Sequence, residues 1–148
     1  MAGKREGDNL GKKDVKRNLF QRILGIPATA LLEDKSAWSF SGNTIVVHLE
    51  RVPALHERGG GIRLEDDGLP ERVLVIHGND GAYHAFRNRC GHGGRRLDPV
   101  PDDETIQCCS VGKTTCGYSG EVLSGSSKKP THAYRVDAEP GKLTIHLD

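Results

Sequence analysis

The 148-residue chain carries 21 lysines and arginines against 20 aspartates and glutamates, so its formal net charge is +1. A chain of this length folds as one compact domain whose core needs no disulfide bridges, and its balanced charge excludes a global attraction to nucleic acid or to an anionic membrane. No apolar run approaches the roughly 20 residues of a membrane span, and residues 1–10 lack the features of a secretory signal, so we expect a cytoplasmic protein.

The first 38 residues are predicted to be a tail that contains one short helix. Residues 1–13 are rich in glycine, lysine and aspartate without apolar periodicity, which predicts disorder. Apolar residues then recur at helical spacing from Val15 to Leu24, with Asp14 as N-cap, which predicts an amphipathic helix. We expect its apolar face to pack on the domain rather than to lie on a membrane surface. That face consists of Leu19, Phe20, Ile23 and Leu24.

Residues 39–148 are predicted to form an all-β domain of antiparallel strands. Short β-branched and aromatic segments alternate with turn residues, which is typical of strands joined by hairpins. Strands are expected over Thr44–Leu49, Arg72–Ile76, Ala82–Phe86, His132–Ala138 and Lys142–Leu147. Residues 77–81 and 139–141 contain the Gly, Asn, Asp and Pro residues that hairpin turns require, so two hairpins are predicted. The segment 89–130 between the hairpins is expected to consist mainly of loops.

All four cysteines lie in this loop-rich segment, at Cys90, Cys108, Cys109 and Cys116. Cysteines of a disulfide-built secreted domain are numerous and spread along the chain, whereas these are crowded together. The crowding therefore favours a metal or cluster site. The alternative is that the thiols are small apolar residues of an ordinary core.

Two of these cysteines belong to motifs with a characteristic spacing. Cys90-Gly91-His92 is followed by fifteen residues (93–107) and then by Cys108-Cys109-Ser110-Val111-Gly112. This spacing resembles that of the Rieske 2Fe-2S family, which has the pattern CxH, a similar interval, and CxxHG. Leu97, Ile106 and residues 120–125 also stand where family members have a leucine, a strand residue and a strand with its turn. The likeness extends over Ser39–Asp148. It implies a Rieske-like antiparallel β sandwich with two cluster-binding loops, preceded here by the short helix.

The resemblance also implies a ligand set, and this chain departs from it at one position. Two thiolates hold one iron of a Rieske centre and two imidazoles hold the other. Here Cys90, His92 and Cys108 stand at ligand positions, but Val111 stands where the second histidine is found. The substitute ligand is expected to be the thiol of Cys109, with Cys116, water or no ligand as the alternatives.

The function implied is electron transfer through a 2Fe-2S cluster, as a ferredoxin-like carrier or an oxidoreductase subunit. The expected partner is a redox protein, either a reductase or an oxygenase component, and Arg95 and Arg96 are candidates for docking an acidic partner. Two alternatives stay open at this point. One is a binding or accessory module that has the fold without a cluster, and the other is a structural zinc site of three cysteines and one histidine. No nucleotide or flavin motif suggests a stand-alone enzyme.

Overall fold

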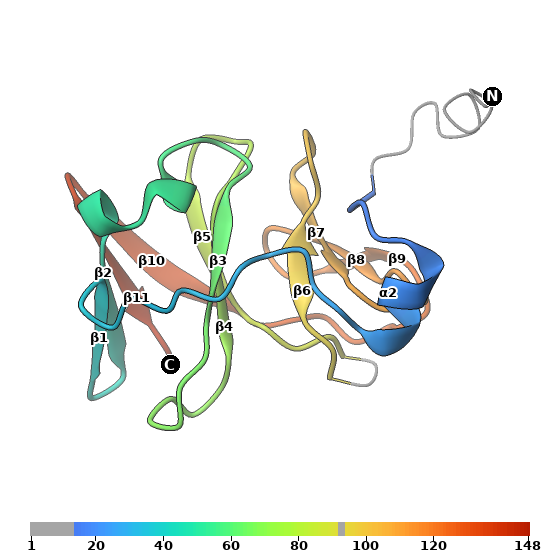
Figure 1. Ribbon diagram of the computed structural model, residues 1–148, viewed down its shortest axis with the longest axis horizontal. Coiled ribbons are helices and arrows are strands. Elements are labelled where there is room, and N and C mark those ends of the chain that lie inside the picture. The colour runs from blue at the N-terminus through green and yellow to red at the C-terminus, as the bar shows by residue number, and fades with distance from the viewer. Residues whose placement is uncertain (1–13, 92–93) are drawn as a thin grey trace.

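The structure, a computed structural model, describes residues 14–91 and 94–148 and consists of two antiparallel sheets placed side by side (Figure 1). The larger sheet has seven strands in the order β1-β2-β11-β10-β5-β4-β3, and the smaller has four in the order β6-β7-β8-β9. The larger sheet comprises β1 (Trp38–Ser41), β2 (Thr44–His48), β3 (Gly61–Leu64), β4 (Val73–His77), β5 (Tyr83–Arg87), β10 (Ala133–Glu139) and β11 (Lys142–His146). The smaller comprises β6 (Leu97–Pro99), β7 (Thr105–Cys108), β8 (Thr115–Gly117) and β9 (Val122–Ser124).

The two predicted hairpins are present, each within one residue of its expected strand boundaries. Strand β4 pairs with β5 and strand β10 with β11, both antiparallel. Each turn contains a glycine with positive φ, which is +86° at Gly81 and +78° at Gly141, a conformation that glycine adopts without strain. The all-β antiparallel fold expected from the sequence is therefore confirmed. The segment 89–130 is more regular than expected, because its short strands form the smaller sheet.

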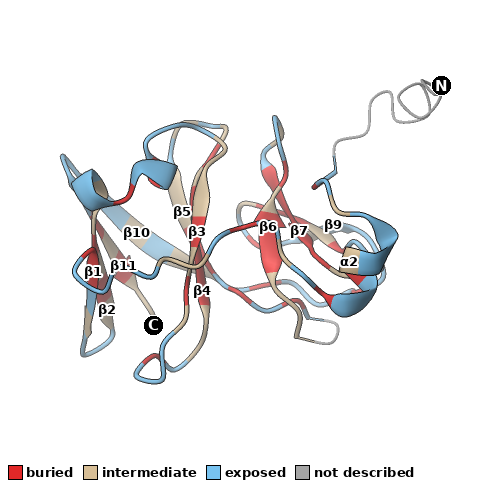
Figure 2. Ribbon diagram, viewed as in Figure 1, coloured by how far each residue is buried: buried red, intermediate tan, exposed pale blue. Residues whose placement is uncertain are grey.

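Buried side chains form one apolar cluster within the larger sheet and a second one between the two sheets. The second cluster is important for the site because it joins strands β4 and β5 to the cysteine-containing segment. Its buried members are Leu74, Ile76, Phe86, Cys90, Leu97, Ile106, Cys108 and Cys116. Full burial of an aliphatic or aromatic side chain stabilises a fold by about 1.5–3 kcal/mol. Figure 2 shows buried residues along β4, β6 and β7, where the two sheets meet.

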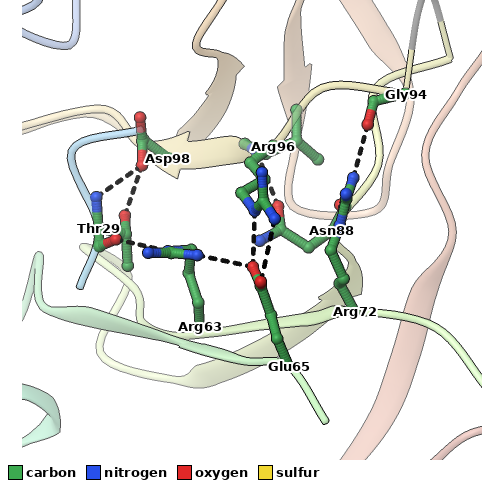
Figure 3. A network of polar contacts seen from close by, with 9 residues as sticks. Thr29, Arg63, Glu65, Arg72, Asn88, Gly94, Arg96 and Asp98 are labelled. Atoms are coloured by element: carbon green, nitrogen blue, oxygen red, sulfur yellow. Dashed lines mark hydrogen bonds and ion pairs between the residues drawn. The ribbon is translucent and has the colours of Figure 1, made fainter. Parts of the chain in front are cut away.

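A network of charged side chains also crosses the junction of the sheets (Figure 3). The Arg96 guanidinium donates two hydrogen bonds to the Glu65 carboxylate, at 2.6 and 3.0 Å, and Arg63 donates a third at 2.7 Å. Arg72 donates to the main-chain oxygens of Asn88 and Gly94, which stand on either side of the first cysteine-containing loop. This network fixes that loop to the end of β3.

The N-terminal helix α2 (Leu19–Leu24) is shorter than predicted and presents the opposite face to the protein. Asn18, not Asp14, is its N-cap, and Asn18 and Gln21 form a reciprocal capping box. The prediction that its apolar face packs on the domain was wrong, because Leu19, Phe20, Ile23 and Leu24 are 53–68% exposed. Arg22 is 4% exposed instead.

The reason for this orientation is that the Arg22 guanidinium has four oxygen acceptors, three of them on the domain and one in the N-terminal segment. Nη1 donates to the carbonyl oxygens of Cys108 and Ser110 at 3.2 and 3.1 Å. Nη2 donates to the Val15 carbonyl at 2.8 Å and to Gln107 Oε1 at 3.0 Å. A buried charge is tolerated when its hydrogen bonds are made, and the apolar side chains of so short a helix do not outweigh that requirement.

The rest of the N-terminal segment also contacts the domain. Ala28 N and Thr29 N each donate to the Asp98 carboxylate at 2.9 Å, and Leu31 forms a parallel bridge with Arg63. The predicted disorder of residues 1–13 concerns residues outside those described. Among the described residues, no helix is long and apolar enough to cross a membrane.

Candidate functional site

The first and second cysteine-containing loops meet where β5 and β7 end. Cys90 lies three residues beyond β5, in a turn closed by hydrogen bonds from Cys90 N to Arg95 O and from Gly94 N to Cys90 O, at 2.7 and 3.1 Å. Cys108 is the last residue of β7 and pairs with Leu97 of β6. Both cysteines are at most 3% exposed, and their thiols form a hydrogen bond with each other. The two loops that the family resemblance implied therefore bring Cys90 and Cys108 together.

The surroundings of Cys108 favour its thiolate form. The hydrogen bond with Cys90 is the largest influence, and together with a hydrogen bond from Ser110 and the charge of Arg95 it lowers the pKa of Cys108 to about 6, although burial acts in the opposite direction. Cys108 Sγ and Ser110 Oγ are 3.1 Å apart. The thiolate is the form of cysteine that binds metals. The Cys90–Cys108 pair is therefore suited to bind a positively charged metal centre.

The other two cysteines are buried in different surroundings. Burial raises the pKa of Cys109, and Cys108 and Asp98 nearby raise it further. The Cys109 amide donates to Arg96 O at 3.0 Å, which ties the second loop to the first. Cys116 shares the apolar cluster of Cys90 and Cys108, and burial raises its pKa as well. Among residues 14–91 and 94–148, no three Cys, His, Asp or Glu side chains form a group that could hold a metal ion.

Of the two positions at which the family has imidazole ligands, only the second lies among the described residues. His92 lies outside the described residues. Val111, at the place of the second histidine, is 51% exposed and lines a surface pocket of about 440 Å³. Arg22, Ile23 and Arg95 line the same pocket. Valine has no donor atom, so this side of the site offers no described ligand from the expected position.

Helix α2 lies against both loops, a contact that no motif in the sequence indicated. Arg22 holds the carbonyl groups of Cys108 and Ser110 in the second loop. A side chain at Gly25 would begin 1.6 Å from Arg95 Nη1, so the helix end lies directly against the first loop. Arg22 lies outside the predicted apolar face of the helix, and the domain oxygens that bind it lie 85–88 residues away in the sequence, so the helical pattern could not indicate its burial.

The described donors fit the thiolate half of a Rieske cluster. Two buried cysteines from separate loops are in contact, one has a pKa lowered to about 6, and the charge of Arg95 is close to it. This is the donor chemistry that one iron of such a centre requires. Arg95 Nη1 is buried and has no hydrogen-bond partner among the described residues, so the site carries positive charge that no described carboxylate at this position neutralises.

Comparison with known proteins gives relatives in sequence and in structure, although no family model matches the chain. A stretch of 77 residues is 27% identical to the 3-phenylpropionate/cinnamic acid dioxygenase ferredoxin subunit of Shigella flexneri serotype 5b (strain 8401), covering 51% of this chain and 73% of that protein. The subunit of the same name from Escherichia coli (strain K12) is also 27% identical, with the same coverage.

Solved structures share the fold. The ferredoxin of carbazole 1,9a-dioxygenase from Nocardioides aromaticivorans IC177 superposes with a TM-score of 0.56 at 21% identity, over 70% of this chain and 95% of that one. A chain of the complex of reduced oxygenase and oxidized ferredoxin in carbazole 1,9a-dioxygenase has a TM-score of 0.53 at 17% identity, over 62% and 84%. A quaternary ammonium Rieske monooxygenase has a TM-score of 0.50 at 21% identity over 65% of this chain, which spans only 29% of that enzyme.

Proposed function

We infer that this chain, a member of the Rieske 2Fe-2S domain family, is an electron-transfer protein that works as a ferredoxin-like carrier or as a subunit of an oxidoreductase. The contact between the buried thiols of Cys90 and Cys108 is the observation that carries this proposal. The sequence relatives are ferredoxin subunits, and the ferredoxin among the structural relatives is covered over 95% of its length.

The residues that would hold the cluster are Cys90 and Cys108 at one iron and His92 at the other. When bound, a Rieske centre accepts and releases electrons at potentials of about −150 to +300 mV. The protein contributes burial and hydrogen bonds. The Ser110 hydroxyl lies 3.1 Å from Cys108 Sγ, and hydrogen bonds to ligand sulfurs are one of the means by which proteins adjust such potentials.

For the fourth ligand we propose the thiolate of Cys109, which adjoins Cys108 in the second loop. Its place beside Cys108 in the chain supports this choice, although burial and the charges of Cys108 and Asp98 raise the pKa of Cys109, so that binding a metal would have to stabilise its thiolate. Cys116 is the alternative, since it shares the apolar cluster of the Cys90–Cys108 pair. Either choice requires a local rearrangement on binding, because no third described donor stands beside the pair.

A redox protein is the proposed partner, either a reductase or an oxygenase component, as for the ferredoxin subunits that the chain resembles. We propose a cytoplasmic location because the four cysteines are free thiols, which a reducing compartment preserves.

The test is to purify the full chain without oxygen and to measure its absorption and electron paramagnetic resonance spectra together with iron, sulfide and zinc content. A coloured protein with two irons and two sulfides per chain is the expected result. A colourless protein with one zinc per chain would replace the proposal with a structural metal site, and a colourless, metal-free protein would indicate a binding or accessory module.

A further inference from the structure

A second pocket opens directly beside Cys90 and is lined by cationic side chains. Its volume is about 360 Å³, and its lining includes Arg87, Arg89, Cys90, Gly91, Lys129 and His132. No aspartate or glutamate is among its described lining residues. The chain as a whole has a net charge of +1, so this excess of positive charge is a local feature.

The arginines and the lysine of this pocket form no ion pair with a carboxylate among residues 14–91 and 94–148. Neither Arg87, Arg89 nor Lys129 forms an ion pair with another described residue, whereas Arg96 is bound by Glu65. His132 Nε2 lies 3.2 Å from the main-chain oxygen of the C-terminal residue, Asp148. The available charge is therefore that of the two arginines and the lysine. Arg96 is not free for the docking role considered from the sequence.

The pocket is built on a fixed backbone. Arg87 N donates to His132 O at 2.9 Å, and the Thr131 hydroxyl donates to Arg87 O at 3.0 Å. A Cβ at Gly91 would lie 2.5 Å from Lys129 Cβ, so the first loop and the segment that carries Lys129 are in close contact. The three cations are thus held at one place, next to a residue that binds the proposed cluster.

We propose that this pocket receives carboxylate side chains of an acidic electron-transfer partner, an inference that rests on the proposed function and specifies the partner's surface. Arginine presents paired N–H donors that match a carboxylate, and complementary charge accelerates the encounter of redox proteins. A second copy of this chain is a poor occupant because it would bring the same cations to the contact. Nucleic acid is disfavoured because the described lining residues include no Phe, Tyr or Trp on which a base could stack.

The first test measures binding of a hexaglutamate peptide with a neutral fluorescent label to the full chain by fluorescence anisotropy. The variant Arg89→Gln/Lys129→Gln should weaken binding about tenfold, and added salt should weaken binding to the wild-type chain. The matched control is Arg51→Gln/Arg58→Gln, which removes the same charge from exposed positions outside the pocket and should change affinity far less. Equal losses in both variants, no binding of the peptide, or tighter binding of a single-stranded oligonucleotide would overturn the proposal.

A second measurement uses small oxidants of opposite charge on the reduced, cluster-loaded protein in a stopped-flow instrument. Ferricyanide and tris(phenanthroline)cobalt(III) each take one electron from the protein, the first as an anion and the second as a cation. The pocket variant should be oxidised about tenfold more slowly by ferricyanide and no more slowly by the cobalt complex. Equal slowing by both oxidants would contradict the electrostatic role. If the protein carries no cluster while the peptide still binds at the pocket, the proposed electron-transfer function is wrong. The inference that an acidic partner binds the pocket is then retained.

Discussion

Replacing Arg22 with methionine should destabilise the protein strongly, although Arg22 belongs to a six-residue helix at the surface. Its guanidinium makes four hydrogen bonds, and three of them, to Cys108 O, Val15 O and Gln107 Oε1, are buried. Hydrogen bonds to charged groups contribute about 1.5–3 kcal/mol each, but methionine avoids the cost of burying a charge. We therefore expect a net loss of about 3 kcal/mol in the free energy of unfolding.

The assay is urea and thermal unfolding followed by circular dichroism. For a domain of this size, a loss of about 3 kcal/mol lowers Tm by roughly 6–12 °C. The matched control is Arg17→Met, because the Arg17 Nε hydrogen bond goes only to the carbonyl of its neighbour Lys16. That control should change stability by less than about 0.5 kcal/mol. Arg22→Lys should lie between the two because it keeps the charge with fewer donors.

Hydrogen exchange locates the effect. In Arg22→Met the amides of the second loop, at residues 108–113, should exchange faster, while those of the β10–β11 hairpin should change little beyond the global loss of stability. If Arg22→Met and Arg17→Met unfold at the same temperature and exchange alike, the Arg22 hydrogen bonds do not hold the second loop and the reasoning fails.

Three further predictions concern pH and the ligands. Hydrogen bonds from Arg96 are the main reason that the pKa of Glu65 falls from 4.5 to about 2. The ionised Glu65 should therefore stabilise the fold by about 3 kcal/mol above pH 4.5, and this stabilisation should be lost as pH falls towards 2. Acid titration of Glu65→Gln should lack that step. Cys109→Ser should remove cluster absorption and Cys116→Ser should not; if both keep the wild-type spectrum and potential, no thiolate replaces the histidine. The reduction potential of the wild-type chain should lie below the Rieske range, towards about −400 mV, because a thiolate replaces one imidazole. Val111→His should raise this potential, and an unchanged potential would show that residue 111 does not reach the cluster.

The elements that the sequence predicted well depend on neighbouring residues alone. The β4–β5 and β10–β11 hairpins follow from strand-forming residues around Gly- and Asn-rich or Pro-Gly turns, which restrict the backbone locally. The meeting of Cys90 and Cys108 followed from their spacing, because the interval between them resembles that of the Rieske ligand loops. The short strands of the smaller sheet gave a weaker signal, since three or four residues show little alternation.

Only the tertiary structure decided which charged groups are buried, paired or available. Arg22 is not part of the apolar face that the helical periodicity predicted, and its burial depends on carbonyl groups 86 and 88 residues away in the sequence. Arg89 and Arg96 both lie near the first loop, yet only Arg96 is paired with Glu65. Arg89 lines the cationic pocket and is available to a partner. The sequence by itself therefore determined the strands, the turns and the spacing of the ligands, because these are set by local backbone preferences. The orientation of α2 and the pattern of free cations required the fold, because hydrogen bonds and ion pairs are decided by which distant acceptors the packed sheets bring within reach.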